Sequence, residues 1–279
     1  MRVQLDWLNQ KLTERIVAIA SGSLSPAAAR DAATVMLVRD AGSGGVEVLM
    51  LKRPSSMKFA AGAYVFPGGS VDPADGEAKI GWLGPSAEEF GEKLGASAEL
   101  ARALVCAAVR ETFEEAGILL AGTPDKELAV PEGPDWDADR AALTAGEVSL
   151  AELLARRGLV LRADLLTPWA RWITPLAEPR RFDTRFFAAA LPVGQTVVGH
   201  AAEADQVAWL RPADGLAAAR RGDMSLLPPT ATTLSEFAAA TGAGDILSRK
   251  RTIAPIEPVL ITENGRAWLE VPDGVGYLP

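Results

Sequence analysis

The stretch that decides the fold is Arg110–Leu120, which reads RETFEEAGILL. Glu111, Glu114 and Glu115 stand at positions i, i+3 and i+4, so a helix here would carry all three carboxylates on one face. Like charges at this spacing destabilise an isolated helix by roughly 0.2–0.5 kcal/mol per pair. The crowding therefore predicts that the three carboxylates serve a function rather than the stability of the helix.

The sequence around this stretch predicts a long helix with defined ends. Ser97 is a suitable N-cap, so the helix is expected from about Ala98 to Ala116, and Gly117 can take the left-handed conformation that ends it. A shorter helix is expected to begin at the capping box Ser86–Glu89 and to stop near Gly95. The apolar side of the long helix is formed by residues that lie away from the glutamates: Val105, Val109, Phe113 and Ala116.

Strands are expected on both sides of this helix. Before it, β-rich runs and a glycine-rich connection predict a hairpin and a third strand that ends at Pro67-Gly68-Gly69: Ala32–Arg39, Val46–Lys52 and Ala63–Phe66. After it, three strands are expected at Arg171–Ile173, Arg185–Leu191 and Gln206–Leu210. Two helices are expected at Leu150–Arg157 and, after the Pro228-Pro229 break, at Leu234–Ala240. An Asn-Gly turn predicts a hairpin of Pro258–Thr262 with Arg266–Val271. Residues 121–148 are rich in Pro, Gly, Asp and Glu and predict a surface excursion. Without regular βαβ alternation, the order favours an α/β fold with a mixed sheet flanked by helices.

The composition limits the classes of function. The 279 residues carry a net charge of −8, which argues against nucleic acid or an anionic membrane surface as a partner. No apolar run approaches the roughly 18 residues of a membrane span, and charges interrupt the N-terminal segment that a signal peptide would need. The single cysteine, Cys106, fits a reducing cytoplasm and is expected to be a buried thiol. Leu5, Leu8, Leu12, Ile16 and Ile19 predict an amphipathic N-terminal helix.

The pattern Arg110-Glu111-x-x-Glu114-Glu115-x-Gly117-Ile118, preceded by Gly68-Gly69, resembles the box that defines the Nudix hydrolases. Thr112 stands where a bulky aliphatic residue is usual. The resemblance implies an α/β/α sandwich that hydrolyses a nucleoside diphosphate linked to another moiety, with Mg²⁺ or Mn²⁺ on Glu111, Glu114 and Glu115. Hard divalent cations do prefer carboxylate oxygens. An acidic, solvated helix face is the alternative reading.

The spacing departs from the family pattern in two ways. Arg110 follows Gly69 by 41 residues, where the family spacing is 14, which predicts an insertion of about 27 residues at about 70–96. The family also has a glutamate eight positions before the arginine, where this chain has Arg102, and Glu99 is the nearest acid. A split box resembles the coenzyme A diphosphatase type of the family. We therefore expect an N-terminal extension over residues 1–30, and a single Nudix domain with helical insertions over residues 31–279.

The stretch upstream of the glycines resembles a coenzyme A signature. It has a Leu-rich strand, then Arg53, a basic residue five positions later, and Phe-Pro-Gly68-Gly69. Lys58 stands where the signature has arginine. The ammonium of a lysine acts as a point charge, so it is less selective for phosphate geometry than the bidentate guanidinium of an arginine. The resemblance implies that Arg53 and Lys58 bind substrate and that Gly68 and Gly69 let the backbone approach its phosphates. An ordinary strand–loop–strand with one surface lysine is the alternative.

Two further groups are candidates for the site. Arg180, Arg181 and Arg185 form a basic group that can meet substrate phosphates, or that can pair with Asp183 and Glu178 for local structure. Many Nudix enzymes place a glutamate on the loop before a strand such as Gln206–Leu210. By resemblance Glu203 is a fourth metal ligand or general base, with Asp205 as its rival. The only histidine, His200, is expected to be a structural or surface residue.

Together these features predict an Mg²⁺- or Mn²⁺-dependent Nudix diphosphohydrolase. Arg110 is expected to orient Glu114, and Glu114, Glu115 and Glu203 to serve catalysis. Coenzyme A or an acyl-coenzyme A leads as the small-molecule nucleotide substrate, giving 3′,5′-ADP and a phosphopantetheine. ADP-ribose or a nucleotide sugar is the alternative substrate, and a non-catalytic Nudix-fold ligand sensor is the alternative class. The oligomeric state stays open, with a homodimer among the options.

Overall fold

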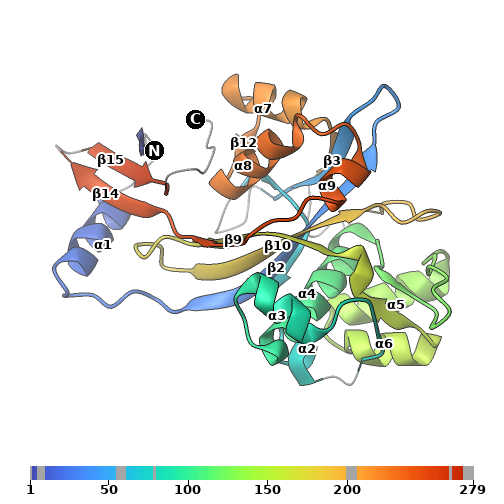
Figure 1. Ribbon diagram of the computed structural model, residues 1–279. Coiled ribbons are helices and arrows are strands. Elements are labelled where there is room, and N and C mark those ends of the chain that lie inside the picture. The colour runs from blue at the N-terminus through green and yellow to red at the C-terminus, as the bar shows by residue number, and fades with distance from the viewer. Residues whose placement is uncertain are drawn as a thin grey trace.

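The computed structural model describes residues 2–4, 10–54, 61–77, 80–198, 206–263 and 266–272. Within them, one mixed sheet of nine strands forms the centre of the protein (Figure 1). Its members are β2 (Ala29–Asp40), β3 (Val46–Lys52), β4 (Ala63–Val65), β5 (Gly68–Ser70), β9 (Thr167–Ile173), β10 (Arg181–Ala190), β11 (Gln206–Leu210), β12 (Ser225–Leu226) and β13 (Pro255–Ile256). The order along the sheet is β12-β4-β3-β2-β10-β9-β13, with β5 paired to β2 and β11 to β3. Because β2 runs parallel to β10 and antiparallel to β3, the sheet is mixed, as predicted.

Helices cover both faces of this sheet (Figure 1). One face carries α2 (Pro73–Glu77), α3 (Ala87–Leu94), α4 (Ala98–Ala116), α5 (Pro134–Thr144) and α6 (Leu150–Arg157), and the other carries α7 (Pro212–Arg220), α8 (Pro228–Phe237) and α9 (Ala243–Leu247). The alternation along β2 divides the core accordingly. Val35 and Leu37 pack with α4, while Met36 and Val38 belong to the core on the opposite face. The predicted α/β sandwich is confirmed.

Two small sheets and a helix complete the described part. One sheet contains β6 (Trp82–Leu83), β8 (Val160–Arg162) and β7 (Ala121–Gly122), and the 3₁₀ helix η1 (Ala163–Leu165) follows β8. The other contains β1 (Arg2–Gln4), β15 (Arg266–Glu270) and β14 (Val259–Glu263). The hairpin of β14 and β15 is confirmed, and its turn residues, Asn264 and Gly265, lie outside the described residues. Helix α1 (Gln10–Ala20) buries Leu12 and Ile16, as its amphipathic pattern predicted, whereas Leu5 and Leu8 lie outside the described residues.

The ends of the two helices before the glutamates follow local rules. Ser86 caps α3 in a complete capping box, and Ser97 accepts the Leu100 N–H at the start of α4. Gly95 and Gly117 end the two helices in the left-handed region, with φ of 62° and 70°. Because a residue with a Cβ is strained there, these glycines fix where the helices stop. The predicted bounds of α4 are therefore correct.

Three predicted boundaries are wrong. Residues 121–148 are not only a surface excursion, because α5 lies among them and its Leu143 is buried. Pro134 starts that helix, and Pro228 and Pro229 likewise begin α8 instead of preceding it, since a proline in the first turn needs no N–H partner. Gly68 and Gly69 do not only end a strand, because they form β5 and pair with β2.

Among the described residues, no helix combines the length and hydrophobicity needed to span a membrane.

Cys106 belongs to α4, lies in the core on the α4 side of the sheet and is 1% exposed, as predicted. Burial raises the pKa of its thiol to about 12, so only about one molecule in ten thousand carries the thiolate at pH 8. We expect iodoacetamide to label the native protein no faster than the protein unfolds, and to label it within minutes in guanidinium. Rapid labelling of the folded protein at pH 8, followed by mass spectrometry, would contradict this placement.

Candidate active site

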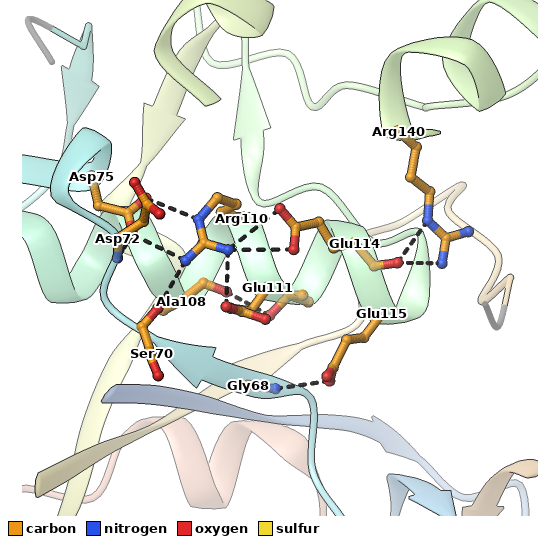
Figure 2. A network of polar contacts seen from close by, with 11 residues as sticks. Gly68, Ser70, Asp72, Asp75, Ala108, Arg110, Glu111, Glu114, Glu115 and Arg140 are labelled. Atoms are coloured by element: carbon orange, nitrogen blue, oxygen red, sulfur yellow. Dashed lines mark hydrogen bonds and ion pairs between the residues drawn. The ribbon is translucent and has the colours of Figure 1, made fainter. Parts of the chain in front are cut away.

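The glutamates of α4 face the glycines of β5 (Figure 2). Glu115 Oε2 accepts a hydrogen bond from the Gly68 N–H at 2.9 Å. A Cβ built on Gly69 would overlap the carboxylate of Glu111. Gly69 is therefore required for space, because its missing side chain lets the Glu111 carboxylate lie directly against the strand. Helix and strand together hold two carboxylates beside the half-buried glycines of β5.

Arg110 connects the acidic groups of the site (Figure 2). Its Nε and Nη2 each donate to Asp75 at 3.0 Å, and Nη2 also donates to the Ser70 carbonyl at 2.9 Å. Its Nη1 donates to Glu111 at 2.9 Å and to both oxygens of Glu114 at 3.3 Å. Burial disfavours the charged guanidinium, but the hydrogen bond to Asp75 and the charges of Glu111, Asp75 and Glu114 outweigh it. The pKa of Arg110 is therefore raised, and the group stays charged.

Asp75 is the acidic residue that the sequence analysis missed. Counting back from Arg110 led to Arg102 and to Glu99, but Glu99 lies in the exposed first turn of α4. Asp75 is 4% exposed and forms the bidentate pair with Arg110 across 35 residues of sequence. In the family spacing the glutamate lies eight positions before the arginine, and the arginine lies 14 positions after the second glycine. Counted forward from Gly69, the same spacing places the acidic residue at position 75, so the sequence did indicate Asp75, at the start of the predicted insertion.

Arg140 is a second residue that the sequence did not reveal. It extends from α5, is 8% exposed, and donates from Nε and Nη2 to the Glu114 carbonyl at 3.0 and 2.7 Å (Figure 2). That carbonyl is one of the last four of α4, which have no partner inside the helix. A guanidinium at a helix C-terminus also interacts favourably with the helix dipole. Arg140 thus fixes the turn of α4 that carries Glu114 and Glu115.

The chemistry of these residues fits a divalent cation. Asp75, Glu111, Glu114 and Glu115 supply four carboxylates, and Arg110 supplies one compensating charge among them. Carboxylate oxygens are the ligands that Mg²⁺ and Mn²⁺ prefer. Across the described ranges, no three Asp, Glu, Cys or His side chains already converge as a metal cluster. Arg110 instead contacts both Glu111 and Glu114, and Glu115 contacts Gly68.

The residues predicted upstream for substrate binding are only partly described. Arg53 follows β3, its backbone N–H donates to the Ala63 carbonyl, and its buried Nε has no hydrogen-bond partner among the described residues. Lys58, Glu203 and His200 lie outside the described residues, as does Asp205. The roles of these residues stay predictions.

The arginines of β10 serve the sheet. Arg185 is 2% exposed and pairs with Asp31 at 2.6 Å and with Asp183 at 3.1 Å. Arg181 is also buried and donates to Glu257 and to two backbone carbonyls, whereas Arg180 is exposed. These contacts favour the alternative of local structure for Arg181 and Arg185. The binding of substrate phosphates by Arg180, Arg181 and Arg185 stays a prediction.

Residues 85–237 match the family model of the NUDT19 Nudix domain, which is more than half of the chain. The chain belongs to the Nudix hydrolase family. A Nudix hydrolase from Alicyclobacillus acidocaldarius has the same fold, with a TM-score of 0.66 and 30% identity over 81% of this chain and 98% of that one. Among curated relatives, the putative nudix hydrolase 7 of Caenorhabditis elegans is 32% identical, over 68% of this chain and 55% of its own length.

Two vertebrate relatives carry a more specific name. The acyl-coenzyme A diphosphatases NUDT19 of Gallus gallus and Homo sapiens are each 28% identical to this Nudix chain, over 72% and 66% of its residues. The matches cover 65% and 58% of those proteins, so the chain spans less than two thirds of the curated relatives' length. The match of the family model over more than half of the chain establishes the family.

We expect Asp75→Asn to destabilise the protein by about 3–5 kcal/mol, because it leaves the charge of the largely buried Arg110 side chain without its bidentate partner. Urea unfolding followed by circular dichroism measures this. Asp223→Asn is the matched control, since its pair with Arg221 is 63% exposed on both sides and is worth about 1 kcal/mol or less. Equal effects of the two substitutions would contradict a central role for the Asp75–Arg110 pair.

Alanine at the two glycines of β5 separates fold from function. The three atoms nearest to a Cβ at Gly69 all belong to the Glu111 carboxylate, at the end of a side chain that can be displaced, so Gly69→Ala should change stability by less than about 1 kcal/mol, while the displaced carboxylate lowers turnover about 100-fold. A Cβ at Gly68 would lie 2.5 Å from the Ala33 carbonyl oxygen and 2.7 Å from Thr34 Cα. Gly68→Ala should therefore cost about 1–3 kcal/mol. Thermal melts and turnover assays of both variants test this, and full activity of Gly69→Ala would be the contrary result.

Proposed function

We propose that this Nudix hydrolase uses divalent cations to cleave the diphosphate of coenzyme A or an acyl-coenzyme A, giving 3′,5′-ADP and a phosphopantetheine. The observation that carries the proposal is the contact of the α4 glutamates with the glycine backbone of β5. It brings carboxylates and a backbone without side chains together, which is what a diphosphate and its cations require. The names of the vertebrate relatives support coenzyme A as the substrate.

The carboxylates of Glu111, Glu114 and Glu115 would hold Mg²⁺ or Mn²⁺. When bound, such ions neutralise diphosphate charge and lower the pKa of a coordinated water. Arg110 holds Glu111 and Glu114 in fixed orientations from one side, and Asp75 in turn holds Arg110. Charge-assisted hydrogen bonds of this kind restrict the rotamers of long side chains, so that little reorganisation is needed when substrate arrives. Glu203 remains the proposed candidate for a further ligand or general base.

The position of Gly68 and Gly69 supports their proposed role toward the phosphates. Both lie on β5, one strand away from the centre of the sheet, and face the carboxylates of α4. A side chain at Gly69 would occupy the space of the Glu111 carboxylate, whereas one at Gly68 would meet Ala33 and Thr34 of β2. The proposal further places the enzyme in the cytoplasm, on the ground of its single buried cysteine, and treats a homodimer as an assembly to be tested by light scattering.

Glu115→Gln tests the carboxylate platform directly. The amide keeps the shape of the side chain and an oxygen for the Gly68 N–H, but it removes one negative charge. We expect the melting temperature to stay close to that of the wild type and turnover to fall at least about 100-fold. Glu92→Gln, on an exposed position of α3, is the control and should keep full activity. Near-normal turnover of Glu115→Gln would sink the proposed role of the platform.

The substrate is tested by a panel of coenzyme A, dephospho-coenzyme A, ADP-ribose and NADH, each assayed with Mg²⁺ and with Mn²⁺. We expect the highest kcat/KM for coenzyme A, because the proposed enzyme recognises both ends of that molecule. A preference for ADP-ribose would reject coenzyme A and keep the hydrolase. Absence of turnover on every member of the panel would favour a ligand sensor.

A further inference from the structure

An open pocket of about 370 Å³ lies directly beside Arg110 and Glu114. Its walls come from three places on the α4 side of the sheet: residues 72–75 at the start of α2, the helix α4 itself, and residues 143–152, which connect α5 to α6. Figure 1 shows α2, α5 and α6 on this same side. The volume falls within the range of about 300–1,000 Å³ that is usual for small-molecule sites. The pocket is thus large enough for part of a substrate and adjoins the proposed reaction centre.

The charges of this pocket select what can enter it. Five carboxylates line it, and Arg110 is the only cationic side chain among its lining residues: Asp72, Asp75, Glu114, Glu147 and Glu152. Like charges brought together in an interface cost several kcal/mol. A polyanion such as the 3′-phosphorylated nucleotide end of coenzyme A is therefore repelled from this side of the site.

The remaining lining suits an uncharged chain. Leu143, Val148 and Leu150 give the pocket apolar walls, and the carboxylates are strong acceptors for amide and hydroxyl donors. The pantetheine arm of coenzyme A combines these features, because it is an uncharged chain with two amides, a hydroxyl and a pair of methyl groups. The connection between α5 and α6 is anchored in the core at both ends, since Leu143 and Leu150 are each 3% exposed.

We propose that this pocket binds the pantetheine arm of the substrate, so that the diphosphate lies on the α4 glutamates and the nucleotide end points away from α5 and α6. The inference rests on the proposed function and adds the direction in which the substrate lies. It also makes the α5–α6 connection the part of the chain that sets specificity for the group on the far side of the diphosphate. Arg140 links that connection to the reaction centre, because it joins α5 to the Glu114 carbonyl.

Product inhibition tests the direction, because the two products represent the two ends of the substrate. Glu147 is exposed at the pocket, so Glu147→Trp can fill the space without disturbing the core. We expect this substitution to raise the KM for coenzyme A and the inhibition constant of 4′-phosphopantetheine about tenfold, while kcat and the inhibition constant of 3′,5′-ADP stay within about twofold. Glu132→Trp is the matched control, since Glu132 is also exposed but does not line the pocket, and it should leave all four values unchanged.

The outcomes separate this inference from the proposed function. If the wild type hydrolyses coenzyme A but Glu147→Trp weakens inhibition by 3′,5′-ADP instead, or weakens inhibition by neither product, the assigned direction is wrong and the function stands. If the wild type does not hydrolyse coenzyme A at all, the proposed function fails and the inference fails with it. Melting temperatures of both tryptophan variants within a few degrees of the wild type exclude misfolding as the cause.

Discussion

The structure of the site depends on the bidentate pair of Arg110 and Asp75. Asp75 precedes α3 and α4 in the chain, and Arg110 belongs to α4, so the pair fastens the segment after β5 to the helix that carries the glutamates. The same guanidinium reaches Glu111, Glu114 and the Ser70 carbonyl. A helix face with three glutamates would repel itself if it stood alone. One buried cation, held by an aspartate from outside the helix, makes that face compatible with a stable fold.

Local interactions explain what the sequence could predict. Ser97 and Gly117 set the ends of α4, and the alternation of Val35, Met36 and Leu37 sets the two faces of the sheet. Each of these signals lies within a few residues of the structure it determines, so no knowledge of the tertiary fold is needed to interpret it. The glutamate cluster belongs to this class as well, because the periodicity of one helix brings its members together.

Contacts between distant segments explain what the sequence could not predict. Arg140 reaches the Glu114 carbonyl over 26 residues, from a region whose composition indicated only a surface excursion. Its partner is a backbone atom, which leaves no mark on the residue type at position 114. Arg181 and Arg185 show the same dependence on the fold, because residues that form one basic cluster in the sequence make separate ion pairs with Glu257, Asp31 and Asp183. Residue type and spacing indicate a charge, but only the fold determines which charge it faces.

The balance of charge at α4 explains why the proposed binding of a diphosphate requires cations. Asp75, Glu111, Glu114 and Glu115 outnumber Arg110 four to one, so the described site alone repels an anion. In the proposed function, divalent cations on the glutamates would reverse that sign locally, and phosphate affinity would then depend on the cations bound. The pocket toward α5 and α6 adds Asp72, Glu147 and Glu152, none of which is a proposed metal ligand, and would stay unfavourable for a second anion. The acidic residues would thus attract the diphosphate through its cations and exclude the nucleotide end from one side, which would give the substrate a single direction.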